Sequence, residues 1–318
     1  MKVTEHIESG NGKTLFSFEI LPPLKGQTIQ SIFDHIDPLI EFKPPFIDVT
    51  YHREEYDFHE VTSGLLRKKV VRKRPGTVGI CAAIQNRYDI DAVPHILCGG
   101  FTKEDTENLL IDLGFLGIDN VVALRGDAVK SETYFKPEKE GHAYAEELVK
   151  QIVAMNNGKY LDDSLENSAH TDFCIGVAGY PEKHMEAPSM ESDFHFLKKK
   201  IKNGAHYIIT QMFFDNKKYF DFVDRCRKED IDVPIIPGLK PLATKKQLNL
   251  IPHRFKVDLP DDLVMEVVRC KDDKEVRQLG VDWCIEQSKG LIAAGVPVLH
   301  YYSMGKSDNI QAVAKAVF

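Results

Sequence analysis

Short β-branched or aromatic runs alternate along the chain with longer stretches in which apolar residues recur at helical spacing. Eight runs are predicted to form strands: 14–20, 46–51, 92–98, 120–126, 173–180, 207–214, 232–238 and 297–303. Helices are predicted near 27–42, 59–73, 102–116, 143–155, 190–203, 217–229 and 276–294, with a weaker pattern from about 243 and a closing helix at 306–318. This alternation predicts an α/β fold in which parallel strands close into a single (β/α)8 TIM barrel.

The segment TVGICAAI (77–84) is also strand-like and does not fit this count. We assign the third strand to 92–98 because it runs directly into a helix for which Thr102 is a good N-cap, whereas 77–84 runs into QNRYDID. An extra strand or a short helix at 77–90 stays open.

We expect one catalytic domain over 1–318, because barrels of this size are single units and no Ser-, Gly- or Pro-rich linker divides the sequence. The first ten residues lack the apolar core of a signal peptide, and the near-apolar run 290–299 is too short to span a bilayer. A cytoplasmic protein that is neither exported nor inserted into a membrane is therefore expected.

The net charge of −7 argues against a nucleic-acid partner. The basic runs 67–74 and 198–200 are short and are interpreted as parts of helices, with 67–74 as a solvated face. The six cysteines form no C-x-x-C pair, H-E-x-x-H is absent, and His184 is isolated. Neither a disulfide framework nor a metal site is expected.

Two polar insertions fall on opposite ends of the predicted barrel. The segment 128–142 follows the fourth strand and belongs to the catalytic face, so we expect it to touch ligand. The segment 156–171 follows a helix, belongs to the opposite face, and is expected to be structural or mobile.

The last residues of the strands supply a polar set that would converge on one pocket. A strand-end Thr or Tyr taken singly often only caps a loop, but so many ionisable groups at one barrel mouth predict a ligand site. They are Glu19, Thr50, His95, Arg125 with Asp127, Tyr180, Gln211 and Tyr302.

Two of these positions carry particular chemistry. Glu19 stands among apolar sequence neighbours in FSFEILPP (16–23), a setting that favours a protonated acid, although an ordinary salt-bridged glutamate explains it equally well on the sequence alone. In ALRGD, Gly126 lets the backbone approach a ligand, and Arg125 can meet a phosphate or a pyrimidine carbonyl.

No G-x-G-x-x-G follows a strand, and GNGKT (10–14) is no Walker A motif because its first Gly would fall at Ile7. Any nucleotide must bind at the barrel mouth.

Seven short motifs, in this order, resemble the methylenetetrahydrofolate reductase family over nearly the whole chain. Each is weak alone, but the ordered set is highly specific. They are FSFEILPP (16–23), DVTY (48–51), PHILC (94–98), ALRGD (123–127), YPEKHMEA (180–187), ITQMFFD (209–215) and IIPGLKP (235–241). The form resembled is the single-domain bacterial one, without the C-terminal regulatory domain of eukaryotic relatives.

The resemblance implies a flavoprotein with FAD at the C-terminal mouth of the barrel strands. It would reduce 5,10-methylenetetrahydrofolate to 5-methyltetrahydrofolate with NADH or NADPH by a ping-pong route, and so supply methyl groups for methionine synthesis. By resemblance to bacterial members we expect NADH, and a homo-oligomer that is a dimer or a tetramer.

By the same resemblance, Glu19 matches the general acid of the folate half-reaction and Asp127 the carboxylate between flavin and pterin. Gln211, Gln247 and Lys306 are the implied folate contacts. The positions that would line FAD are Thr50, Tyr51, His95, Arg125, Gly126, Asp127, Ala145, Tyr180, His184, Ala187, Asp193 and Lys200, with Thr50 also near the nicotinamide. For Lys200, a solvated helix face fits the sequence as well as a ligand contact.

Some positions depart from the family pattern. The segment 52–55 reads His-Arg-Glu-Glu where relatives carry small residues, and Lys240 interrupts an apolar element. Lys306 stands where an arginine is expected, and Ile251 where an aromatic ring would stack on folate. Two other functions stay open: another FAD-dependent barrel oxidoreductase such as a proline dehydrogenase-like enzyme, and a catalytically idle flavin- or folate-binding protein.

Overall fold

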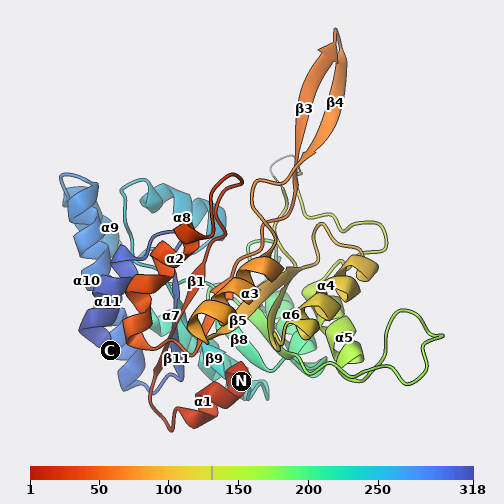
Figure 1. Cartoon of the computed structure of the whole chain (residues 1–318). Helices are drawn as coiled ribbons and strands as arrows, with labels where there is room; N and C mark the ends of the chain where they lie inside the picture. Colours follow the sequence, from red (N-terminus) through yellow and green to blue (C-terminus); the bar gives the residue numbers. More distant parts are fainter. Residues whose placement is uncertain (130–131) are drawn as a thin grey trace.

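A computed structural model describes residues 1–129 and 132–318 of the chain. Within these ranges, parallel strands form one sheet that curls into a barrel, with helices around it (Figure 1). The strands are β1 Leu15–Ile20, β2 Phe46–Val49, β5 Asp91–Leu97, β6 Asn120–Leu124, β7 Cys174–Gly179, β8 Tyr207–Thr210, β9 Ile235–Ile236, β10 Gly238–Leu239 and β11 Val298–Tyr302.

The barrel is closed because β9 and β10 are two pieces of one strand, interrupted at Pro237. β9 pairs with β8 and β10 with β11, and the Pro237 carbonyl accepts a hydrogen bond from the backbone N–H of His300 at 3.1 Å. Counted in this way, the described residues hold the eight barrel strands that the sequence predicts, in the predicted order. The prediction of a (β/α)8 barrel is confirmed.

The predicted helices follow the strands, except for one. Thr102 caps α4 as expected, because its Oγ1 accepts a hydrogen bond from the Asp105 backbone N–H at 3.0 Å. None of the helices in the described ranges is both long enough and apolar enough to cross a membrane. The helices are α1 Val3–Ser9, α2 Gln30–Ile36 with the 3-10 helix η1 Asp37–Phe42, α3 Thr77–Tyr88, α4 Lys103–Phe115, α5 Ala145–Asn156, α6 Met190–Lys202, α7 Asn216–Lys228, α8 Gln247–Phe255, α9 Asp261–Arg269, α10 Asp273–Ala293 and α11 Asp308–Val317.

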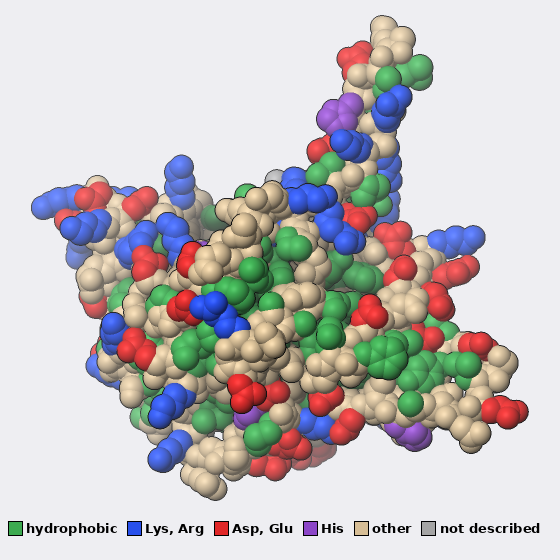
Figure 2. Space-filling model, viewed as in Figure 1, with side chains coloured by type: hydrophobic (Ala, Val, Ile, Leu, Met, Phe, Trp, Pro, Cys, Tyr) green, Lys and Arg blue, Asp and Glu red, His purple; other side chains and the backbone are tan. Residues whose placement is uncertain are grey.

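The helix predicted at 59–73 is wrong. β3 Glu55–Thr62 and β4 Leu65–Val71 instead form an antiparallel hairpin that projects from the barrel (Figure 1). The basic run 67–74 therefore lies largely on a strand, not on a helix face, and Figure 2 shows Lys and Arg side chains along this arm. The helix that follows β2 is α3, so the open alternative of a helix at 77–90 is the one that the structure supports.

A short helix that the sequence did not predict, α1 Val3–Ser9, covers the N-terminal end of the barrel. The Val3 backbone N–H donates to Asn120 Oδ1 on β6 at 2.8 Å, and the Val3 side chain packs with Phe46 and Val298 inside the barrel. Apolar side chains thus fill the lower half of the barrel and leave polar ones near the mouth.

Strand alternation separates two cores. Phe16, Phe18 and Ile20 point outward into the large cluster between the barrel and its helices. Leu15, on the same strand, packs with the inner cluster. Alternation places Ser17 and Glu19 on that inner face as well.

The two polar insertions lie at the ends that were predicted. The segment 156–171 joins the end of α5 to the start of β7 and is tied to α4, because Glu107 Oε2 accepts from the Leu161 backbone N–H at 2.8 Å. The segment 128–142 follows β6; its positions 130 and 131 lie outside the described residues. Phe135 from this insertion reaches the barrel mouth and lies beside Gly99.

Candidate active site

Glu19 lies at the mouth of the barrel with its side chain turned inward. Thr50, directly after β2, places its Oγ1 2.5 Å from Glu19 Oε1 and 2.9 Å from the Ile20 carbonyl oxygen. A hydroxyl can rotate its single proton. Thr50 can therefore donate to an ionised Glu19, or accept from a protonated Glu19 while donating to Ile20, so the contact suits both states of the acid.

His95 lies between two carboxyl groups. Its Nε2 is 3.6 Å from Glu19 Oε2 and 3.5 Å from Asp48 Oδ2. Burial by itself would lower the pKa of His95, but the charges of Glu19 and Asp48 outweigh it and raise that pKa above the ordinary histidine value. The imidazole next to Glu19 is accordingly disposed to hold a proton.

The apolar setting expected for Glu19 is wrong. Its sequence neighbours Phe18 and Ile20 face the outer core, because adjacent residues of a strand point to opposite sides. The groups that touch Glu19 are polar, namely Thr50 and His95. The contacts of its carboxyl group are thus a hydrogen bond with Thr50 and a charged neighbour in His95.

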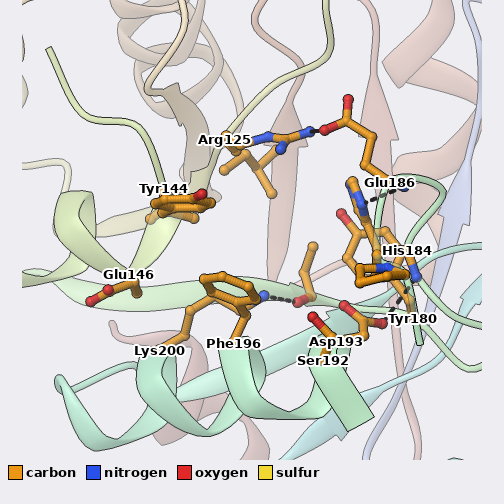
Figure 3. A pocket seen from close by; sticks show the side chains of 16 residues that line it. Arg125, Tyr144, Glu146, Tyr180, His184, Glu186, Ser192, Asp193, Phe196 and Lys200 are labelled. Atoms are coloured by element: carbon orange, nitrogen blue, oxygen red, sulfur yellow. Dashed lines mark hydrogen bonds and ion pairs between the residues drawn. The ribbon is translucent and has the colours of Figure 1, made fainter. Parts of the chain in front are cut away.

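A second group of predicted residues lines a cavity of about 290 Å³ beside β6 and β7 (Figure 3). This volume is at the lower end of small-molecule sites, so the cavity would hold one part of a large ligand. The predicted cofactor residues that it brings together are Arg125, Ala145, Tyr180, His184, Ala187, Asp193 and Lys200.

Arg125 is the cation at the upper edge of this cavity in Figure 3. It pairs with Glu186 at 2.7 Å, and its guanidinium lies 4.9 Å from the centre of the Phe135 ring. Its buried Nε has no hydrogen-bond partner among the described residues. Gly126, the next residue, has a φ of +83°, which glycine adopts without strain. A guanidinium with an unused donor, next to a glycine turn, suits an anionic or carbonyl-bearing ligand.

Tyr180 and His184 form an edge-to-face pair with ring centres 4.7 Å apart. The loop that carries His184 is held by α6, because Asp193 Oδ2 accepts from the His184 backbone N–H at 3.0 Å. Burial, and then the charge of Arg125, lower the pKa of His184. A neutral imidazole is therefore presented to the cavity.

Lys200 is buried, which excludes one of the two interpretations left open for it. Its Nζ donates to the Ala178 carbonyl oxygen at 2.5 Å, and burial lowers its pKa to about 8, against the raising effect of Asp193. The interpretation as a solvated helix face is wrong for this residue, and the ammonium group lies at the cavity.

The sequence reasoning missed two aromatic walls of the cavity. Tyr144 and Phe196 stack with ring centres 5.0 Å apart, on the left in Figure 3. Phe196 could have been found, since Asp193, Phe196 and Lys200 have the i, i+3, i+7 spacing of one helix face. Tyr144 precedes α5 and carries no such signal.

The remaining predicted site residues lie elsewhere around the mouth. Asp127 is exposed, and Tyr51 packs on Phe101 with ring centres 5.2 Å apart. Gln211 follows β8, where its Oε1 accepts from the Met212 backbone N–H. Gln247 Oε1 is engaged by backbone N–H groups of the preceding loop, at 2.6 Å from that of Ala243.

Lys306 is exposed in the loop after β11. That loop reaches the first strand, because Ser303 Oγ donates to the Glu19 carbonyl oxygen at 2.6 Å. The structure thus brings Lys306 to the Glu19 side of the mouth, and the cavity residues named above lie on the β6–β7 side.

The segment 52–55 also borders the cavity region. Arg53 pairs with Glu132 of the 128–142 insertion and lies against Gly99 and Gly100. Its guanidinium and that of Arg125 both lie near the Phe135 ring, at 5.9 and 4.9 Å. Arg53 thereby anchors the insertion next to the cavity.

A barrel whose ionisable side chains converge at the carboxyl ends of its strands is the architecture of a barrel enzyme. Sequence comparison narrows this class. The family model for methylenetetrahydrofolate reductase matches residues 2–317. The chain belongs to the methylenetetrahydrofolate reductase family.

Curated relatives agree with this assignment. The 5,10-methylenetetrahydrofolate reductase of Escherichia coli is 32% identical over 303 residues, which are 95% of this chain and 90% of that protein. Methylenetetrahydrofolate reductase 1 of Schizosaccharomyces pombe is 31% identical over 95% of this chain, and methylenetetrahydrofolate reductase (NADH) 1 of Arabidopsis thaliana is 31% identical over 96%. The chain spans about half the length of these two eukaryotic relatives, 45% and 48%.

A solved structure shares the fold. It is a Clostridium thermocellum protein described as binding two copies of 5-methyl-5,6,7,8-tetrahydrofolic acid, with a TM-score of 0.60 and 16% identity. The match covers 99% of this chain and 97% of that one. At this identity the likeness concerns the fold alone.

Proposed function

We propose that the protein reduces 5,10-methylenetetrahydrofolate to 5-methyltetrahydrofolate, with FAD as its cofactor and NADH or NADPH as reductant, in a ping-pong reaction. This reaction would supply methyl groups for methionine synthesis. The observation that carries the proposal is the carboxyl group of Glu19, which meets Thr50 and His95 at the barrel mouth of a chain that belongs to this family.

The cavity beside β6 and β7 fits a part of FAD. Arg125 has a buried donor without a partner in the described part of the chain, and Lys200 and the neutral His184 supply further donors, which suits a pyrophosphate or its riboses. Tyr180 and Ala187 form a less polar part of the cavity lining. When bound, FAD would supply the hydride chemistry, first as acceptor and then as donor.

In the folate half-reaction, Glu19 would act as the general acid. Its proton would pass to N10 of the folate as the bond from N10 to the bridging carbon breaks, and the electron pair of that bond stays on N10. Thr50 holds Oε1 in place through the hydroxyl contact at 2.5 Å. Because Thr50 accommodates both protonation states, it need not move as Glu19 gives up its proton.

The other assignments of the site stay predictions. Asp127 would stand between the flavin and the pterin, and its exposure at the mouth leaves it open to both. Gln211, Gln247 and Lys306 would contact folate; Gln247 would first have to release the backbone N–H groups that its Oε1 accepts from. Tyr51, His95, Gly126, Ala145 and Asp193 would border the flavin.

We further propose NADH as the preferred reductant, a cytoplasmic location, and a homo-oligomer, either dimer or tetramer. Among the curated relatives, the Arabidopsis thaliana and Zea mays proteins carry NADH in their names. Exposed Phe58, Leu66 and Val70 on the hairpin give the protein apolar surface that assembly could cover. The single catalytic domain over 1–318 also stays a prediction.

The experiment that tests the function measures the two half-reactions separately. Purified protein reconstituted with FAD should show visible flavin absorbance that NADH bleaches and the folate restores. In Glu19→Gln, NADH should still bleach the flavin, whereas reoxidation by the folate should slow about a hundredfold or more, as loss of a general acid does. Glu41→Gln, which changes an exposed acid on η1, is the control. A protein that binds no FAD, or a Glu19→Gln variant that reduces folate at the normal rate, would overturn the assignment.

A further inference from the structure

Asp48 is a buried carboxyl group inside the barrel, next to the candidate acid. It is 0% exposed, and neither carboxylate oxygen has a hydrogen-bond partner within the described residues. A buried carboxylate without compensation is costly. Its presence at this position therefore calls for a balancing charge.

The strand register fixes Asp48 beside Glu19. Residue 48 is the Cα partner of Glu19 on β1 and of Val93 on β5. Alternation along β2 turns Phe46 and Asp48 into the barrel and Ile47 into the outer core. The two carboxyl groups are thus held at one level of the barrel by its backbone.

His95 is the cation that serves both carboxyl groups. Its Nε2 is 3.5 Å from Asp48 Oδ2 and 3.6 Å from Glu19 Oε2, so the imidazole stands almost midway. Both separations exceed a normal hydrogen bond, and a small rotation of the ring shortens either one. The side chains of His95 and Glu19 are slightly exposed, at 9% and 14%, whereas that of Asp48 is sealed, so protons reach the group from the side of His95 and Glu19.

The other groups that face Asp48 do not balance it. His300 on β11 is buried, and burial lowers its pKa, so it tends to be neutral. Tyr207 on β8, Tyr302 on β11 and Cys81 on α3 have pKa values that burial raises, so they stay neutral as well. Lys240 acts on Glu19 but is not among the charges that act on Asp48 or His95. Compensation for Asp48 therefore falls to His95.

We propose that Asp48 is a positioning residue that keeps His95 protonated, so that His95 returns a proton to Glu19 in each turnover. The role rests on the function proposed above. The proton of Glu19 leaves for N10 of the folate, the Nε2 proton of His95 passes to the Glu19 carboxylate, and a proton from water at the mouth restores the imidazolium. Asp48 stays ionised throughout and binds no substrate.

The charges of both carboxyl groups raise the pKa of His95, so the sign of a charge change can be worked out. Asp48→Asn removes one negative charge at nearly constant shape, and the remaining pair then binds protons less strongly. The pH above which folate reduction declines should shift down by about one unit, which is about a tenfold slower rate on the alkaline side. Reduction of the flavin by NADH should show no such shift of its pH profile, because it needs no proton from Glu19.

The kinetic test compares Asp48→Asn with Tyr207→Phe across a pH series in rapid mixing of the reduced enzyme with folate. Tyr207 is an ideal control because its buried hydroxyl also lacks a partner in the described part of the chain, but it carries no charge. The proposal requires that the profile shift in Asp48→Asn and not in Tyr207→Phe. Equal profiles in all three proteins, or equal shifts in both variants, would overturn it.

A second measurement does not depend on turnover. Side-chain NMR of isotope-labelled histidines, with His95 assigned by comparison with a His95→Gln variant, should show the wild-type His95 titrating above the ordinary value and the Asp48→Asn His95 titrating lower. If His95 in the folded wild type titrated at the ordinary histidine pKa, Asp48 would not keep it protonated, and this result would stand even if Asp48→Asn did not fold. If the protein lacked folate reductase activity but His95 still titrated above its ordinary pKa, the proposed function would be wrong and the pairing of Asp48 with His95 would still hold.

Discussion

Lys200 shows, at the scale of one residue, how a buried ammonium group costs stability. Its ammonium group lies at the cavity, where its hydrogen-bond partner is the neutral carbonyl of Ala178. Asp193 lowers the energy of the charge but does not cancel the effect of burial, as the pKa of about 8 shows. An anionic ligand would supply the missing compensation.

We predict that Lys200→Met stabilises the ligand-free protein at pH 7. The pKa of Lys200 falls from 10.5 to about 8 on folding, so the unfolded chain binds this proton more strongly. Stability of the wild type should therefore rise with pH between about 8 and 10.5, and the full penalty applies below about 8. Urea unfolding at pH 7 and pH 10 should show an advantage of Lys200→Met that shrinks at the higher pH.

The same substitution should weaken FAD binding about tenfold or more, since it removes a charge-assisted hydrogen bond. Lys202→Met, two residues later on the exposed side of α6, is the matched control and should change neither property. A Lys200→Met variant with unaltered FAD affinity would show that the buried ammonium group serves the fold alone.

The sequence shows the neighbours of a residue along the chain, but the environment of a barrel residue is set by neighbours on adjacent strands. Glu19 could be placed at a strand end, but its environment could not be inferred from Phe18 and Ile20, because these face away from it. Asp48 was overlooked, although it stands two residues before Thr50 on the same face of the strand. Its importance comes from β1 and β5, which lie beside β2 only in the folded barrel.

At the scale of elements, the β3–β4 hairpin stands apart from the barrel. Its apolar side chains are exposed, with Phe58 at 53% and Leu66 at 66%, and Lys68 Nζ lies 3.5 Å from the centre of the Tyr56 ring. A ribbon of this kind is marginally stable alone. The ion pair of Arg72 with Glu54 at its base joins the two ends of the hairpin to each other and adds nothing to the core.

We predict that the barrel folds without this arm. Replacing 56–70 by a short Gly-Ser turn is sterically simple because Glu55 and Val71 are cross-strand partners. The midpoint of thermal unfolding should change by less than about 2 °C, because the deleted residues contribute little to the buried core. Circular dichroism during heating measures this.

Light scattering on the same variant measures its assembly. A shift to a smaller species would place the arm in an interface between copies, while the barrel itself remains folded. A large fall in the unfolding temperature with no change in assembly would contradict the prediction, since the arm would then be part of the fold of each chain.

The hairpin is also the element that the sequence predicted wrongly, and the reason is physical. Period-2 alternation is clear where one face is buried, whereas both faces of this arm meet solvent and the basic residues mask the pattern. Tyr56 and Phe58 do alternate with acidic residues, and Ser63-Gly64 is a turn dipeptide, whose glycine has a φ of +80° in the structure. Those two signals would have favoured a hairpin over a helix.

The fold of the whole chain was easier to predict than its single elements, because each barrel strand is followed by a helix and this order of elements leaves few topologies. The sequence could not show how the barrel closes. Pro237 interrupts the strand of β9 and β10, and Gly238 stands where a Cβ would lie 2.3 Å from the Thr210 carbonyl oxygen. Closure thus depends on glycines facing bulky neighbours, which appear in no local pattern.

Gly176 is the clearest example and gives a prediction for the whole barrel. A Cβ at this position would lie 2.4 Å from the ring of Tyr207, which is 0% exposed and has no room to retreat. Gly176→Ala should therefore cost about 1–3 kcal/mol by overpacking and lower the unfolding midpoint by several degrees.

Gly79→Ala is the matched control, because Gly79 lies within α3, its φ is not positive, and none of the described atoms comes within 4 Å of the added methyl group. It should instead stabilise the protein by about 0.5–1 kcal/mol, as alanine does in a helix. The two substitutions add the same methyl group, so opposite signs in one calorimetry series would attribute the loss to the filled barrel interior. Equal and small effects would mean that Tyr207 can move, and the interior beneath Asp48 and Glu19 would then be looser than their proposed roles require.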